Sequence, residues 1–194
     1  MRNPFDPGYA TTDELRGLGF AEVGDNVMVA RNCTIIGLEN IHIGDNVRID
    51  GMTTVSAANG HCRIGRNIHI GGYVHLACTG GIVLEDFANL SQGVRIYSVS
   101  DDYSGGTMTN PTVPSEYKEV DVSPVRVGRH VVLGCGSIVL PGVDVGDGCA
   151  VGALSLVVKS LADWGIYAGT PVRRIKARSR SLLDMEKRYL NDFG

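Results

Sequence analysis

The chain has 194 residues, of which 43% are hydrophobic and 20% charged, and its net charge is −3. That length suits one domain over 1–194, and no apolar run reaches the roughly 18 residues that a membrane-spanning helix needs. The slightly negative charge gives nucleic acid no general reason to bind. The five cysteines contain no Cys-x-x-Cys pair and the first ten residues do not look like a signal peptide, so we expect core thiols in a cytoplasmic protein.

Residues 1–22 precede any regular repeat. Thr11 and Glu14 have the spacing of a capping box, which predicts a short helix ending near Gly17. Because a repeat structure exposes the core of its terminal units, we expect this segment to cap one end of the fold.

Residues 23–96 and 125–178 repeat with a period of six. Branched aliphatic residues stand at every sixth position, and the fourth position after each is small or apolar; the clearest anchors are Val127, Leu133, Val139, Val145, Val151 and Val157. Neither a helix nor a flat strand has this period. A chain that turns a corner every six residues has it, so we expect an all-β parallel β-helix of roughly six three-walled coils.

Two details of the repeat concern its corners. The phrases Gly-Asp-Asn at 24–26 and 44–46 supply glycine and asparagine, which tolerate the positive φ of tight corners. The pattern also shifts by two residues at 41–43 and 82–84, and gains three residues between 55 and 64.

The repeat stops over 97–124, which is polar and contains three prolines and three tyrosines. Long loops inside a compact fold are usually functional or disordered, and the aromatic content favours a function. We therefore expect a loop that leaves one corner of the coil and forms the wall of a site.

The C-terminal part combines a basic cluster with a helix. Six basic residues between Lys159 and Arg180 stand against one acid, Asp163, which suits either a polyphosphate ligand or a solvated tail. Over 179–194 the apolar residues follow a helical stripe, so we expect an amphipathic helix that starts at Ser179 or Ser181 and packs on the coil or on a neighbouring subunit.

A more specific signature runs from Val127 to Lys159 and from Ile166 to Lys176. Its hexads end in Val-Gly-Ala, Val-Lys, Ala-Gly-Thr-Pro and Arg-Arg-Ile-Lys. With these motifs, residues 23–178 resemble the hexapeptide-repeat acyltransferases, in particular the galactoside, maltose and xenobiotic acetyltransferases and the O-acetyltransferases of surface-polysaccharide gene clusters. The resemblance implies a left-handed β-helix, a homotrimer and acetyl-CoA as the acyl donor.

The resemblance also implies where the cofactor binds, in a groove between subunits. Small residues would let the backbone approach the pantetheine arm and thioester, and basic side chains would neutralise the phosphates. The residues at the matching positions are Gly134, Cys135 and Ala153 for the arm, and Lys159, Arg173 and Lys176 for the phosphates.

The catalytic base is less clear. The family usually places a histidine at the start of the long loop, but here that position is Asp101, and 97–124 contain no histidine. His75, one coil earlier, and Asp101 are therefore both candidates for the base. Asp102, Tyr103 and Tyr97 are candidates for binding the sugar acceptor.

These features predict acetyl-CoA-dependent O-acetylation of a saccharide hydroxyl by direct attack on the thioester. One alternative is N-acylation of an amino sugar on a nucleotide carrier, although 1–22 is too short for the extra nucleotide domain that such relatives often have. Another is a scaffold that has lost its base. A zinc-dependent carbonic-anhydrase-like β-helix would need three histidines with a pair five apart, whereas His69 and His75 are six apart, so we expect no metal.

Overall fold

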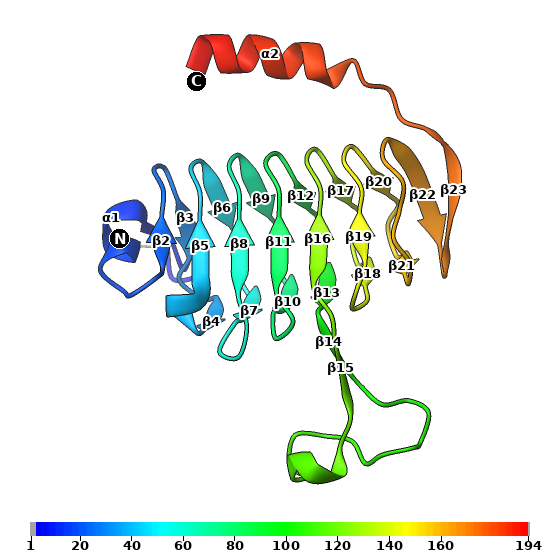
Figure 1. The fold of residues 1–194 in the computed structure, drawn as a ribbon. Helices are drawn as coiled ribbons and strands as arrows, with labels where there is room; N and C mark the ends of the chain where they lie inside the picture. The colour runs from blue at the N-terminus through cyan, green and yellow to red at the C-terminus, as the bar shows by residue number, and fades with distance from the viewer. Residues whose placement is uncertain (1–2, 194) are drawn as a thin grey trace.

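The protein is described by a computed structural model over residues 3–193; residues 1, 2 and 194, which the expected terminal segments include, lie outside the described part. The chain winds as a left-handed parallel β-helix of about seven turns (Figure 1). The expected fold class is therefore confirmed, with slightly more coils than expected.

Three sheets form the walls of a prism, and each turn visits sheet A, then sheet C, then sheet B. Sheet A contains β1 (Tyr9–Thr11), β3 (Met28–Ala30), β6 (Val47–Ile49), β9 (Ile68–Ile70), β12 (Asn89–Leu90), β17 (Val132–Leu133), β20 (Ala150–Val151), β22 (Gly165–Gly169) and β23 (Val172–Ala177). Sheet B contains β2 (Glu22–Val23), β5 (Ile41–Ile43), β8 (Cys62–Ile64), β11 (Ile82–Leu84), β16 (Val125–Val127) and β19 (Asp144–Val145). Sheet C contains β4 (Thr34–Ile36), β7 (Thr54–Ser56), β10 (His75–Ala77), β13 (Arg95–Tyr97), β18 (Ile138–Val139) and β21 (Leu156–Val157).

The hexad anchors fill the inside of the prism. All six anchors from Val127 to Val157 are buried, at most 3% exposed, as the period of six predicts. The two-residue shifts also have a simple cause. The strands β5, β8, β11 and β16 of sheet B bury both of their ends, so Ile41 and Ile43, for example, both face the core. The three extra residues before Ile64 lie in the corner between β7 and β8, where sheet C passes into sheet B.

Glycine and asparagine have different tasks at the corner between sheets B and A. The asparagines Asn26, Asn46 and Asn67 take the positive φ, at 54° to 56°. The glycine two residues earlier makes room for the next coil: a Cβ on Gly24 would overlap the carboxylate of Asp45, which accepts the Asp25 N–H at 2.8 Å. In the Gly-Asp-Asn phrases, the expectation that both residue types serve the positive φ is thus correct only for asparagine, whereas Gly148 takes it at the corner before β20.

Both ends of the coil are covered by antiparallel strands. At the N-terminus, β1 pairs with β3 and leads into α1 (Thr12–Arg16), whose capping box has the Thr11 N–H donating to Glu14 Oε2 at 2.9 Å, as expected. At the other end, β23 turns back on β22. Residues 172–177 are therefore not part of a further coil, as the range 125–178 implied, but a strand that covers the last one.

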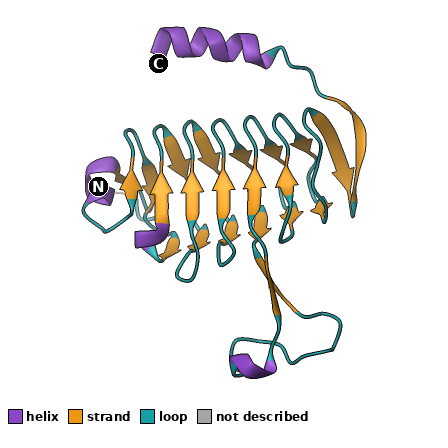
Figure 2. Cartoon of the chain, in the orientation of Figure 1, coloured by secondary structure: helices purple, strands orange, loops and turns teal. Residues whose placement is uncertain are grey.

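The long excursion leaves from the corner where sheet C passes into sheet B (Figure 2). Its neck is a two-stranded antiparallel ribbon of β14 (Val99–Asp101) and β15 (Val120–Val122), and its tip holds a short 3₁₀ turn, Ser115–Tyr117. A second 3₁₀ turn, Leu38–Asn40, lies at the same corner in the first coil. The expected loop exists, with more regular structure at its base than its sequence indicates.

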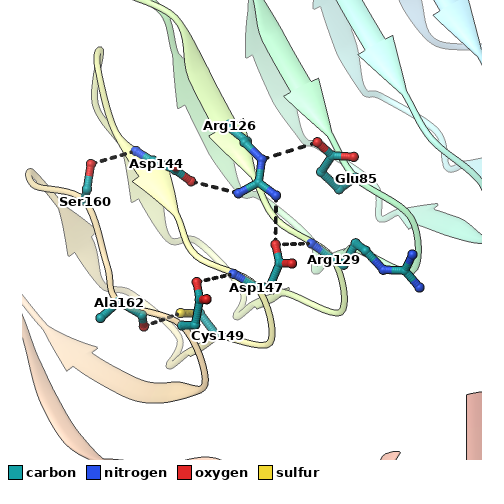
Figure 3. Close-up of polar contacts among 9 residues, drawn as sticks. Glu85, Arg126, Arg129, Asp144, Asp147, Cys149, Ser160 and Ala162 are labelled. Carbon is teal, nitrogen blue, oxygen red and sulfur yellow. Dashed lines mark hydrogen bonds and ion pairs between the residues drawn. The ribbon is translucent and has the colours of Figure 1, made fainter. Parts of the chain in front are cut away.

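The chain returns from the excursion into β16, which is fastened by one arginine. Arg126 reaches carboxylates on both neighbouring turns: Glu85 at 3.3 Å, Asp144 at 3.1 Å and Asp147 at 2.8 Å (Figure 3). A network of this kind holds its members in place better than separate surface pairs do, because one ordered side chain serves several partners.

The C-terminal helix α2 (Leu182–Phe193) runs back along the prism (Figure 1). Glu186 contacts Arg129 and lies 2.9 Å from His130 Nε2, and the Tyr189 hydroxyl donates to Asn67 at 2.9 Å. The helix therefore packs on the corner of its own coil, the first of the two expected positions. Neither α-helix of the described residues is long and apolar enough to cross a membrane.

Candidate active site

A cleft of about 680 Å³ lies between the excursion and the corner from which it leaves. Because equivalent corners stack along the prism, Asn59, Thr79 and Pro141 come from three different turns and form one side of it. The excursion forms the other side with a carboxylate, a phenol and an ammonium group, from Asp101, Tyr103 and Lys118. The loop was expected to wall a site, and this cleft is the candidate for it.

Three of the four predicted residues from the excursion line this cleft: Tyr97, Asp101 and Tyr103. Asp102 does not, because its carboxylate accepts the N–H groups of Ser104 and Thr107 at 2.7 and 2.9 Å. Hydrogen bonds from Ser104, and then from Thr107, lower the pKa of Asp102 to about 2. In this structure Asp102 organises the loop, and direct sugar binding by it stays a prediction.

His75 lies beside the cleft rather than in its wall. The centre of its ring is 5.6 Å from that of Tyr97, which lines the cleft, so Tyr97 connects His75 with the cleft. Burial, and then the positive charge of Arg95 on the next strand, lower the pKa of His75 below its usual value. The imidazole is thus neutral at pH 7, the form that can accept a proton.

The neck of the excursion is strongly acidic. Asp101, Asp102, Glu119 and Asp121 surround a second hollow of about 430 Å³. The ammonium of Lys118 donates to the Asn110 carbonyl at 2.9 Å and forms no ion pair with these acids within the described residues. A cationic acceptor would be favoured at this neck over a neutral one, because opposite charges attract and the partner cation is already engaged.

The predicted cofactor residues fall into two groups. Gly134, Cys135 and Ala153 stack at the corner between sheets A and C: a Cβ on Gly134 would lie 2.5 Å from the Ala153 nitrogen, so only glycine fits there. Lys159 follows β21 at the far edge of sheet C, and the exposed Arg173 and Lys176 lie on β23. The turn between β22 and β23 contacts the corner of Ala153, since the Thr170 hydroxyl donates to the Leu154 carbonyl at 3.1 Å.

The basic cluster is also divided by its contacts. The Arg178 guanidinium donates to the carbonyls of His130, Gly148 and Cys149, at 2.7 to 3.2 Å. Arg180 lies over the ring of Trp164, 5.3 Å from its centre. These two arginines fasten the C-terminal segment to the coil, which leaves four available cations, the predicted Lys159, Arg173 and Lys176 and the exposed Arg174.

Reasoning from the sequence did not single out Asn59, Lys118 or Arg95. Asn59 belongs to the three-residue insertion, and Arg95 would have been found by counting twenty residues on from His75, its partner in register. Nothing in the sequence distinguishes Lys118 from other exposed lysines. The register along stacked strands is the usable signal, because it places residues of different turns side by side.

The cysteines and the remaining histidines have structural surroundings. All five thiols are free; Cys62, Cys78 and Cys149 are buried, Cys33 is half-buried and Cys135 is exposed. His69 lies on sheet A, away from His75 on sheet C, and contacts Asp50 at 2.9 Å and Asn89 at 3.2 Å. No group of three or more His, Cys, Asp or Glu within residues 3–193 could hold a metal ion.

Comparison with known proteins gives consistent relatives, although no protein-family model matches the chain. A dTDP-4-amino-4,6-dideoxy-D-glucose acyltransferase of Escherichia coli is 42% identical over 178 residues, which cover 92% of this chain and 93% of that protein. A putative lipopolysaccharide biosynthesis O-acetyl transferase, WbbJ of Escherichia coli K12, is 27% identical over 81% of this chain and 88% of its own length.

Solved structures of AntD, an N-acyltransferase from Bacillus cereus, have the same fold. A serine-to-cysteine variant in complex with dTDP-4-amino-4,6-dideoxyglucose and coenzyme A superposes with a TM-score of 0.93 at 39% identity, covering 97% of this chain and 100% of that one. The enzyme in complex with dTDP and 3-hydroxybutyryl-CoA gives a TM-score of 0.90 at 39% identity, covering 97% of this chain and 98% of that one.

Proposed function

The chain belongs to the hexapeptide-repeat acyltransferases, which transfer acyl groups from coenzyme A thioesters to sugars, and on that premise we propose that its acceptor is the amine of a dTDP-linked amino sugar. This is the alternative to the O-acetylation that the sequence led us to expect. The argument against it was the lack of a separate nucleotide domain. That argument fails, because AntD binds dTDP with a chain that matches this one from end to end.

The observation that carries the proposal is the chemistry of the cleft, whose lining among residues 3–193 contains the carboxylate of Asp101 and no histidine. A sugar hydroxyl gives up its proton only with difficulty, so an O-acyltransferase needs a good base close to it. An amine is already a nucleophile once its ammonium form has lost one proton. A carboxylate can hold that ammonium and accept its proton, and the acidic neck favours a cation.

The reaction then needs few groups. The amine nitrogen bonds to the thioester carbonyl carbon, the carbon–sulfur bond breaks, and coenzyme A leaves as its thiol after taking up a proton. Asp101 holds the acceptor and receives the proton of the attacking nitrogen. His75, held neutral beside Tyr97, is the second candidate for this task.

We also propose that the enzyme works as a homotrimer, with each cofactor lying between two chains. The corner between sheets A and C supports this. It carries large apolar residues that are both strained at positive φ and exposed, namely Met52, Tyr73 and Leu154, at 54%, 67% and 76%.

The test compares two acceptors that differ in one group. The purified enzyme is given acetyl-CoA with dTDP-4-amino-4,6-dideoxyglucose or with the matching 4-hydroxy sugar nucleotide, and products are measured by mass spectrometry, because the exposed Cys135 would react with thiol reagents. We expect the amide with the amino sugar and little ester with the hydroxy sugar. Esterification as the faster reaction would restore O-acetylation.

The role of Asp101 has its own test. Asp101→Asn keeps the shape and removes the charge, and we expect kcat to fall about 10²- to 10⁴-fold. Glu116→Gln, an exposed residue at the tip of the same excursion, is the matched control and should behave like wild type. Full activity of Asp101→Asn, with loss of activity in His75→Gln, would move the base to His75.

A further inference from the structure

Arg95 is the one charged residue in the six strands of sheet C. The outward positions of these strands carry threonine, serine, isoleucine, alanine, leucine, His75, Arg95 and Tyr97, and no acid. On either side in register, Arg95 has His75 and Ile138. It forms none of the ion pairs seen within residues 3–193, whereas Arg48, Arg66, Arg126 and Arg129 in the same coils are all paired with carboxylates.

The acids at the two edges of sheet C do not supply its partner. Asp50, at the edge shared with sheet A, already contacts Arg48, Tyr9 and His69 at 2.7 to 2.9 Å. Asp101, at the other edge, lies on the neck of the excursion and forms no ion pair with Arg95 within the described residues. The guanidinium therefore stands free, on the strand that also carries Tyr97 of the cleft.

A free guanidinium on this wall is informative because no other residue in the six strands of sheet C is a carboxylate, lysine or arginine. Ile36 and Val158 of the same wall are 47% and 39% exposed, and a second chain would cover them if the trimer forms. A charge covered in this way without an opposite charge would be destabilising, because it would lose its hydration and gain no partner. Arginine's planar fork of donors matches the oxygens of phosphate groups, which it can bind with two parallel hydrogen bonds.

We propose that Arg95 binds the diphosphate of the sugar nucleotide and so positions the sugar at Asp101. This rests on the proposed function, since it names the group that holds its acceptor. The neutral imidazole of His75 in the adjacent register position supplies a further donor without adding a charge. Arg95 is thus a positioning residue, separate from the cations Lys159, Arg173 and Lys176 that we assign to coenzyme A.

The experiment measures binding by calorimetry, with dTDP, thymidine and coenzyme A as probes. Arg95→Met keeps an apolar stem and removes the charge. We expect dTDP binding to weaken about 10- to 150-fold, the loss of one hydrogen bond to a charged group, with coenzyme A and thymidine binding unchanged. Arg95→Lys should recover part of the affinity. Arg63→Met, an exposed arginine on sheet B that forms no ion pair within the described residues, should bind dTDP like wild type.

Three results would overturn the proposal. Unchanged dTDP binding by Arg95→Met would refute the role of Arg95 and leave the proposed function intact. A loss of coenzyme A affinity equal to the loss of dTDP affinity would have the same consequence. Dissociation of the assembly in Arg95→Met, seen by light scattering, would show that Arg95 pairs with a neighbouring chain instead. A wild-type enzyme that does not bind dTDP would refute the proposed function itself, which separates the two failures.

Discussion

The stacking of glycine against aspartate can be tested at Gly128. A Cβ at this position would overlap the Asp147 carboxylate and lie 2.8 Å from the Asp147 nitrogen and 2.9 Å from the Val145 oxygen. Both backbone atoms belong to the next coil and cannot move aside without bending it. Gly128→Ala therefore places one methyl group where the fold has no space.

The expected cost has three parts. Overpacking a rigid site costs about 1–3 kcal/mol. Displacing Asp147 also breaks its hydrogen bond with the Arg129 N–H, 3.1 Å long, for about 1.5–3 kcal/mol. Replacing glycine restricts the unfolded chain and returns about 0.4–1 kcal/mol. The net loss is about 2–5 kcal/mol, which for a chain of this size lowers Tm by roughly 5–15 °C.

Thermal unfolding followed by circular dichroism measures this, at one protein concentration because assembly changes apparent stability. The control is Gly17→Ala, at the end of α1, where φ is −81° and the nearest contact of a Cβ is 3.5 Å. It should be neutral or slightly stabilising. A Gly128→Ala variant as stable as the control would mean that the coils can separate locally and that the spacing argument is wrong.

Three further predictions concern charge. The pKa of His75 is lowered on folding, so the unfolded chain binds the proton more tightly. The stability of wild type relative to His75→Gln should therefore fall as the pH drops below about 6.5. A difference in stability that does not change with pH would contradict this. Asp102→Ala should speed amide hydrogen exchange at Ser104 and Thr107. In wild type the protection of these amides should hold above about pH 4 and be lost as the pH falls through about 2. Unaltered exchange in the variant would exclude a role of Asp102 in ordering the loop. Neutralising Arg173 and Lys176 together should weaken coenzyme A binding, more so at low salt, and leave dTDP binding unchanged. Calorimetry measures both affinities, with Arg63→Met as the control. Equal coenzyme A affinity of the variant and the control would contradict the assignment.

The coil could be predicted in detail because its signal is repeated. Each anchor from Val127 to Val157 reports the same inward position, so an error at one hexad is corrected by the others. The roles of single corner residues could not be predicted. His130 occupies an ordinary hexad corner, yet its ring stacks on Phe87 at 4.8 Å and lies beside Glu186 of a helix that is 56 residues away.

The candidate site was predicted only in part. Tyr97 and Tyr103 were candidates because they belong to the excursion that interrupts the repeat, and Asp101 because it stands where the resembling family has a histidine. All three line the cleft. Asp102 looks equivalent to Asp101 in the sequence, but its carboxylate accepts a hydrogen bond from Thr107, only five positions later. Local hydrogen bonding of this kind depends on backbone geometry, which the order of the residues does not reveal.

The narrow neck of β14 and β15 holds the two ends of the excursion side by side at a corner that the coil would turn in any case. The packing of the β-helix therefore does not depend on the residues beyond this ribbon. Exchanging the segment between Asp101 and Val120 for one from a related enzyme would leave every strand of the β-helix in place. Acceptor specificity could therefore change in evolution by replacement of this segment alone.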